Sequence, residues 1–246
     1  MSHPTRTLNP MSHRLSKSRY TAGVQCHKLL WWKVHEPNAV ELQPDKVLQD
    51  RFDQGAQVGA LARDRFPGGV LIDLPHHAVE QRVKLTRKLI DEGAPAIFEA
   101  SFLADNTFVA VDVLTPQDRG FHLTEVKSSS SQKEQHLPDA AVQVHVLQES
   151  GVRITGVDVM HLNRECHFPD LDNLFQRTDV TAAVQPVLGK MGWEIDAQLE
   201  MLAGRRPSGL SSPSSNTSPY AADLSRKRRR MFEGRTIGRN RTLAYR

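Results

Sequence analysis

Three charged residues in the middle of the chain have the types and the spacing for metal-dependent chemistry on phosphates. Asp112 is followed by Glu125 and, beyond one valine, by Lys127. Two carboxylates provide the oxygen ligands that a hard divalent ion such as Mg²⁺ prefers. A lysine beside them can orient an attacking water or stabilise charge on a phosphate. An ordinary ion pair between neighbouring strands explains the same spacing, so the three residues alone favour neither interpretation.

Two neighbouring segments favour the metal site. Glu99 lies between Phe98 and Ala100 and is a candidate third acidic group, either directly on a metal or through water. Gln143 follows Asp139 by one turn of the next expected helix, so the two side chains share a face. Gln143 could bind a substrate phosphate or a metal-bound water, or could make only a structural hydrogen bond.

The elements that position these residues are expected to form a β-meander. Alternating apolar residues predict strands over 96–103, 107–115 and 121–128. Asp105-Asn106 is typical of a tight turn, and residues 116–120 are expected to form the second turn. Strict alternation would place Asp112 on the same face as Leu114.

The rest of the fold follows from helical periodicity. A helix over 134–150 leads into a strand over 154–162, which predicts a parallel crossover with the last meander strand. Further helices are expected at 17–33 with Ser16 as N-cap, 45–65, 76–92 and 178–203, and a short strand at 70–72. The last of these helices is expected to be interrupted around Pro186 and Gly189. The predicted fold class is α/β (α+β), with a mixed central sheet, made of a meander plus a parallel crossover strand, flanked by helices.

Three short runs resemble the successive motifs of the PD-(D/E)XK nuclease superfamily: 111–114, 125–129 and 139–143. They most resemble its RecB-like branch, which includes CRISPR-associated exonucleases and uncharacterised bacterial proteins, over roughly residues 15–165. The resemblance implies a restriction-endonuclease-like core and hydrolysis of DNA phosphodiester bonds with Mg²⁺ or Mn²⁺. It implies Asp112, Glu125 and the Val126 carbonyl as metal ligands. It also implies Lys127 as the catalytic lysine and Gln143 as the glutamine of the last motif.

The chain departs from that branch at several positions. Leu147 stands where a tyrosine usually follows the glutamine, and the segment 55–62 lacks the histidine that the branch often carries. Cys26 is similar to the first cysteine of iron–sulfur members. Since Cys166 is the only other cysteine, four thiolates are not available within the chain. A complete 4Fe–4S cluster is therefore not expected, and Cys26 is predicted to be a buried thiol, a remnant of that segment.

Two glycines on the expected helix 45–65 also have two interpretations. Gly55 and Gly59 lie four residues apart on one face. Close packing against another helix is the preferred explanation, and approach of a DNA backbone is the alternative.

Charge separates the chain into a body and a tail. Residues 205–246 carry 11 Lys/Arg and 2 Asp/Glu, a balance of +9, whereas the rest holds 21 basic and 26 acidic groups, a balance of −5. We expect a disordered N-terminus over 1–14, a nuclease-like domain over 15–204 and a disordered basic tail over 205–246. The abrupt change of composition near Arg205 motivates the hypothesis that truncation or a change of reading frame replaced a cysteine-bearing C-terminus.

Other features of the sequence restrict the expected cellular location and the expected binding partners. No secretory signal or membrane span is recognisable, and two cysteines fit a reducing cytoplasm, so we expect a cytoplasmic protein without a membrane partner. Nucleic acid, with DNA favoured, is the expected partner, and the sequence leaves protein partners open. The competing function is a catalytically weak or inactive nuclease fold that acts as a nucleic-acid-binding or assembly module.

Overall fold

The computed structural model describes residues 13–204. The expectations for most of the N-terminal segment and for the tail from Arg205, including the hypothesis of a changed reading frame, lie outside the described residues. Within them, no helix is long and apolar enough to cross a membrane.

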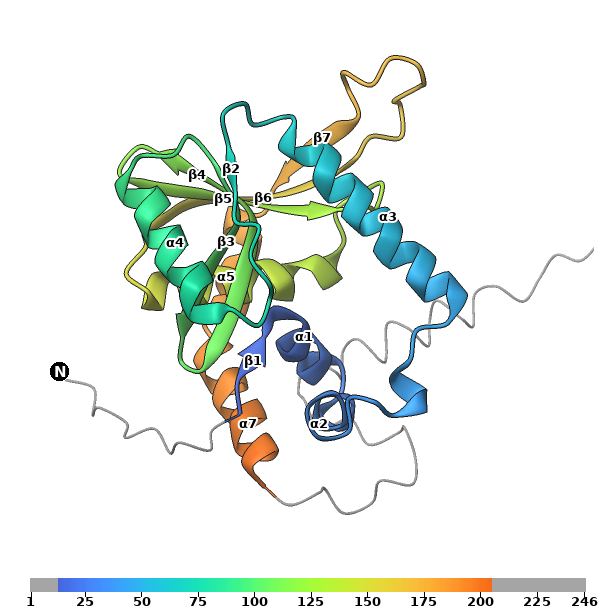
Figure 1. Cartoon of the computed structure of the whole chain (residues 1–246), viewed down its shortest axis with the longest axis vertical. Coiled ribbons are helices and arrows are strands. Elements are labelled where there is room, and N and C mark those ends of the chain that lie inside the picture. The colour runs from blue at the N-terminus through green and yellow to red at the C-terminus, as the bar shows by residue number, and fades with distance from the viewer. Residues whose placement is uncertain (1–12, 205–246) are drawn as a thin grey trace, which may run out of the picture.

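One mixed, seven-stranded sheet forms the centre of the fold, in the order β2-β3-β4-β5-β6-β7 with β1 beside β4 (Figure 1). β3, β4 and β5 form the antiparallel meander, and β5 and β6 are parallel. The predicted mixed sheet with a parallel crossover strand is therefore confirmed. The strands are β1 Leu15–Ser16, β2 Val70–Leu71, β3 Ile97–Ala104, β4 Thr107–Gln117, β5 Gly120–Lys127, β6 Ile154–Leu162 and β7 Phe175–Asp179.

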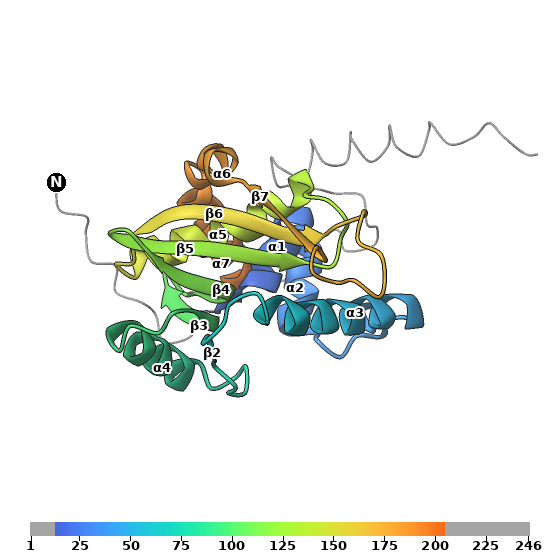
Figure 2. The ribbon, with the colours of Figure 1, turned by 90° about the horizontal axis from the view of Figure 1, so that it is seen from above.

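Helices flank this sheet, as predicted (Figure 2). α5 packs against β3, β4 and β6, α4 packs against β3, α3 contacts β5, and α1 packs on α5. The helices are α1 Lys17–Gln25, α2 His27–His35, α3 Lys46–Arg63, α4 Val79–Asp91, α5 Leu137–Glu149, α6 Thr181–Leu188 and α7 Met191–Ala203, with 3₁₀ turns η1 Val40–Leu42 and η2 Glu134–His136.

Two predicted helices differ from the structure, one in its continuity and one in where it begins. The helix expected over 17–33 is interrupted at Cys26, whose backbone is extended (φ −168°, ψ 120°), so α1 and α2 are separate. The helix expected over 178–203 begins only after β7, and its expected interruption around Pro186 and Gly189 is confirmed by the division into α6 and α7 near Gly189. The sequence of β7, Phe-Gln-Arg-Thr-Asp, lacks the apolar alternation that marks a strand, so β7 was not predicted.

The two hairpin turns differ in how well the sequence predicts them. Asp105 and Asn106 both have left-handed backbones (φ 46° and 54°), which confirms the predicted tight turn. The second turn is shorter than expected, because β4 continues to Gln117 and β5 starts at Gly120. Pro116 is tolerated in β4 because it lies beyond Leu114, the last residue there that pairs with β3.

The expected alternation along β4 is wrong after Asp112. Val111 and Leu114 belong to the main core, whereas Val113 lies in a separate apolar cluster with Phe98. The neighbouring β3 changes faces at the same level, at Glu99, whose backbone is left-handed (φ 58°). Asp112 therefore lies where β3 and β4 exchange their faces.

A buried arginine holds this irregular part of β3. The Arg82 guanidinium, 2% exposed, donates to Ser101 Oγ at 3.0 Å, to the Glu99 carbonyl at 3.3 Å and to the carbonyls of Ile72 and Leu74. Buried carbonyls without donors are costly. Arg82 therefore links the segment after β2 to the position where β3 changes faces.

We expect Arg82→Met to lower the free energy of unfolding by about 3 kcal/mol, because several buried acceptors lose their donor. Urea denaturation followed by circular dichroism measures this loss. Arg87→Met is the matched control on the same helix, since Arg87 is exposed, and it should change stability by less than about 0.5 kcal/mol. Equal effects of the two substitutions would contradict the role assigned to Arg82.

Candidate functional site

The candidate charges converge between the sheet and the helices α1 and α5. Glu125 on β5 is at the centre and is only 1% exposed. Its carboxylate contacts Lys127 Nζ at 2.7 Å through Oε1 and Gln143 Nε2 at 2.7 Å through Oε2. A third contact comes from Lys17 on the first turn of α1, whose Nζ lies 3.1 Å from Oε2 and 3.2 Å from Oε1. The structure thus brings the predicted Glu125, Lys127 and Gln143 together.

Asp112 joins this group from β4. Its Oδ2 accepts a hydrogen bond of 2.7 Å from the backbone N–H of Val126, so β5 fixes the orientation of the carboxylate. Its other oxygen, Oδ1, lies 3.7 Å from Lys17 Nζ. Asp112 and Glu125 therefore share the ammonium group of Lys17, as two metal ligands would share an ion.

Asp139 positions the predicted catalytic lysine. Lys127 Nζ lies 2.7 Å from Asp139 Oδ2 and 2.7 Å from Glu125 Oε1. The other oxygen of Asp139 accepts a hydrogen bond of 2.7 Å from Thr21 Oγ1 on α1. Lys127 is consequently fixed between a carboxylate of β5 and one of α5.

Gln143 is fully buried and orients Glu125. Its Nε2 donates to Glu125 Oε2 and to the backbone carbonyl of Asp139, both at 2.7 Å. Its Oε1 is a buried acceptor without a hydrogen-bond partner among the described residues. The amide therefore positions a carboxylate and leaves one acceptor in the site, which could receive a bond from a water.

Burial and neighbouring charge shift the pKa of each ionisable group in the cluster. Burial and the charge of Glu125 raise the pKa of Asp112 to about 7, although Lys17 partly opposes this. Burial alone would also raise the pKa of Glu125, but Lys17 and Lys127 hold it well below its usual range.

The two lysines remain charged. Burial alone would lower the pKa of Lys17, but Asp112, Glu125 and Asp139 reverse this and raise it above its usual range. Glu125 and Asp139 likewise raise the pKa of Lys127 against the effect of burial. An ammonium that keeps its proton can orient water or stabilise negative charge, but it is a poor proton acceptor.

The donor set fits a hard cation, because Asp112 and Glu125 already share a positive group. Within residues 13–204, no cluster of three or more His, Cys, Asp or Glu side chains is arranged to hold a metal ion. A metal here would therefore rely on the two carboxylates and on backbone or water oxygens, as the implied Val126 carbonyl does. Glu99 pairs instead with Arg82, with its Oε2 3.4 Å from Nη2.

A cavity of about 410 Å³ lies beside Asp112. It is lined by Asp112 and Glu99 and, from α3, by Gly55, Gly59 and Arg63. Close helix packing does not explain the two glycines, because a Cβ added at either would meet no atom within 4 Å. That preferred expectation is wrong, and the approach of a nucleic-acid backbone remains a prediction.

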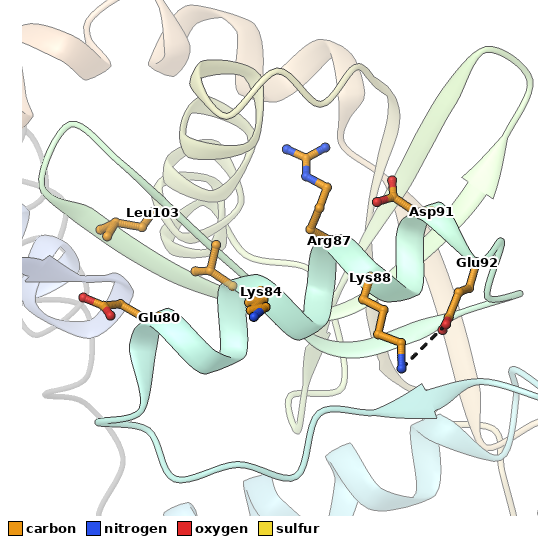
Figure 3. A pocket seen from close by; sticks show the side chains of 8 residues that line it. Glu80, Lys84, Arg87, Lys88, Asp91, Glu92 and Leu103 are labelled. Carbon is orange, nitrogen blue, oxygen red and sulfur yellow. Dashed lines mark ion pairs between the residues drawn. The ribbon is translucent and has the colours of Figure 1, made fainter.

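A larger groove lies elsewhere. It follows the outer side of α4 and is lined by charged residues of both signs, among them Glu80, Lys84 and Arg87 (Figure 3). Lys88 Nζ pairs with Glu92 at 3.6 Å. None of the predicted site residues borders this groove, so the chemistry favours the smaller cavity at Asp112.

Neither cysteine of the chain is paired. Cys26 lies at the break between α1 and α2 and is half-buried, which corrects the expected buried thiol. Cys166 follows β6 and is also half-buried. Leu147, at the position of the missing tyrosine, is fully buried in the main core.

Sequence reasoning missed Lys17 and Thr21. Both lie on α1, which β1 brings to the site by pairing Leu15 with Thr107 of β4. Two residues of β1 give too short a pattern to predict this pairing. Ser16 allowed only the start of α1 to be predicted. Its side chain accepts a hydrogen bond from the backbone N–H of Arg19, as expected of an N-cap.

Comparisons with known proteins add little to this description. No family model matches the chain, and no curated protein matches it. Among solved structures, one described as the crystal structure of SSO0001 matches with a TM-score of 0.32 and 9% identity, over 78% of this chain and 79% of that chain. This similarity is too weak to carry a functional argument.

The raised pKa of Asp112 predicts a pH-dependent gain of stability in Asp112→Asn. Between the unfolded pKa of about 4 and the folded pKa of about 7, the folded state binds a proton that the unfolded state has lost. This carboxylate therefore lowers wild-type stability as pH rises through that range. The asparagine variant lacks the effect.

Thermal melting in EDTA should then give equal melting temperatures at pH 4 and a higher one for Asp112→Asn at pH 8. Asp91→Asn, on the outer side of α4 (Figure 3), should show no such pH-dependent difference from wild type. A constant difference at all pH values would show that Asp112 ionises normally in the folded protein.

Proposed function

We propose that this protein is a metal-dependent nuclease that hydrolyses phosphodiester bonds, with DNA as the favoured substrate. The observation that carries the proposal is the arrangement of Asp112 and Glu125 around one shared cation, with Lys127 2.7 Å from Glu125. Carboxylates from two adjacent strands beside a fixed lysine suit metal-assisted attack on a phosphate. The resemblance of the same residues to PD-(D/E)XK motifs supports it independently of the geometry.

Each residue has a distinct role in this proposal. Asp112 and Glu125 would hold Mg²⁺ or Mn²⁺, together with the Val126 carbonyl. When bound, such an ion neutralises charge on the scissile phosphate and acidifies a bound water. Lys127 retains its proton, so it orients the attacking water and stabilises developing negative charge. Gln143 fixes the Glu125 carboxylate, and Asp139 fixes Lys127.

The cavity beside Asp112 supports a polymeric substrate. Its α3 side is formed by the glycines Gly55 and Gly59, which leave space beside Asp112, and Arg63 adds a positive charge. A sugar-phosphate strand could enter between α3 and the sheet without displacing side chains at those two positions. Arg63 is suited to a phosphate there because its guanidinium can donate two parallel hydrogen bonds.

Cleavage of labelled nucleic acid tests the proposal. The panel contains single- and double-stranded DNA and RNA, with Mg²⁺ or with EDTA. We expect cleavage only with the metal, and a loss of roughly 100-fold or more in Asp112→Ala and in Lys127→Ala, since each removes charge stabilisation at the phosphate.

Lys84→Ala, an exposed lysine on α4 (Figure 3), is the control and should cleave at the wild-type rate. Equal rates for wild type, Asp112→Ala and Lys127→Ala would end the nuclease proposal.

One observation favours a second candidate, a non-catalytic nucleic-acid-binding module. Lys17 and Lys127 already compensate the buried charge of Glu125, so the fold does not need a metal to tolerate this carboxylate. In that case, the basic residues 205–246 would supply salt-sensitive affinity that does not depend on sequence. Removal of these residues should abolish DNA binding in a filter-binding assay, while Asp112→Ala should bind normally. Unchanged affinity after the removal would contradict this candidate.

A further inference from the structure

Lys17 occupies the position between the two carboxylates. Its Nζ faces both oxygens of Glu125, at 3.1 and 3.2 Å, and one oxygen of Asp112, at 3.7 Å. This ammonium comes from α1, 108 residues before Glu125. Lys127, the lysine that the motif predicts, contacts Glu125 and Asp139 instead. The site thus holds two lysines with different partners.

We propose that Lys17 is an internal cation that competes with a divalent metal ion for Asp112 and Glu125, and that it must leave this position when a metal binds. This inference rests on the proposed metal site. It assigns a role to a residue that belongs to none of the motifs on which the nuclease proposal depends.

Geometry makes the two cations mutually exclusive. A Mg²⁺ ion would need oxygens at about 2.1 Å, and Glu125 offers both of its oxygens to Lys17 in the present arrangement. Lys127 and Gln143 already occupy the other sides of the same carboxylate. An ion bound by both Glu125 and Asp112 would therefore have to enter the space that the Lys17 ammonium fills.

Charge balance leads to the same conclusion. Lys17 and Lys127 face the carboxylates of Asp112, Glu125 and Asp139, which leaves a single negative charge when all five groups are ionised. A divalent ion added beside both lysines would make the buried cluster positive. The same ion with Lys17 displaced makes the cluster neutral, which is the favourable outcome where burial penalises net charge.

Lys17 has a route out of this position. Its side chain is 25% exposed, whereas Glu125 is 1% exposed. It lies in the first turn of α1, directly after the Ser16 cap, and its four rotatable bonds allow the ammonium to turn toward solvent. Displacement requires a change of side-chain rotamer and no movement of the helix.

Metal binding to purified full-length protein tests the inference, with a readout that does not depend on cleavage. Lys17→Met keeps the length of the side chain and removes its charge. Isothermal titration calorimetry with Mn²⁺ should show about tenfold or more tighter binding than in wild type, because the competing cation is gone.

Three further variants serve as controls. Lys17→Arg keeps the positive charge and should bind Mn²⁺ no more tightly than wild type does. Lys84→Met removes an exposed lysine on α4 and should leave the affinity unchanged. The double variant Lys17→Met/Asp112→Ala should lose the gain, which shows that the Mn²⁺ sits at the carboxylate pair.

Thermal melting provides a second test in case Lys17→Met is too unstable for the titration. Without Lys17, the pair lacks one neutralising charge, so Lys17→Met should melt below wild type in EDTA and gain more from Mn²⁺ than wild type does. If the variant is unfolded in EDTA, Mn²⁺ should restore its folded circular dichroism spectrum. Failure of Mn²⁺ to stabilise or restore it would overturn the inference.

The outcomes separate this inference from the nuclease proposal. Equal Mn²⁺ affinity in wild type and Lys17→Met, with Mg²⁺-dependent cleavage by the wild type, would overturn the role of Lys17 alone. Tighter Mn²⁺ binding by Lys17→Met, with no cleavage by any variant, would confirm the competition and count against the nuclease. Absence of Mn²⁺ binding in both proteins would overturn both.

Discussion

The buried charge of Glu125 is the constraint on which the centre of this structure depends. A carboxylate that is 1% exposed is tolerated only when its charge is compensated by close partners. Lys17, Lys127 and Gln143 supply this compensation from α1, β5 and α5. The polar contacts with the Glu125 carboxylate therefore hold these three elements together, in addition to apolar packing. Removing any one of the partners leaves the others around an unbalanced charge.

The local irregularities of the sheet serve the same site. At Glu99 and Asp112, β3 and β4 exchange their buried faces, and the Asp112 carboxylate accepts the Val126 N–H where β4 and β5 stop pairing regularly. Arg82 stabilises this arrangement by donating to the Glu99 carbonyl. A regular pleat would direct Asp112 to one face and fix it there. The exchange instead brings its carboxylate to Val126 and to the cavity under α3.

The sequence was sufficient to predict the meander, the crossover and the convergence of Glu125, Lys127 and Gln143. These features depend on periodicities of two and 3.6 residues and on local spacing. It was not sufficient to predict the face on which Leu114 lies. The buried faces change at the level of Glu99, whose left-handed backbone is not predictable from its residue type. It also missed Lys17, whose position depends on a two-residue strand. The break at Cys26 and the strand β7 were missed because neither has a distinctive local pattern.

The parallel pairing of Leu15 with Thr107 has a consequence for folding. This short contact closes a loop of more than ninety residues and is the step that delivers α1 to the carboxylates. A contact across such a long stretch of chain carries an entropic cost of loop closure. Until that contact forms, Glu125 lacks one of its two ammonium partners and the pocket around it is incomplete. The finished charge cluster therefore requires this long-range contact, and a chain in which β1 is not paired with β4 lacks it.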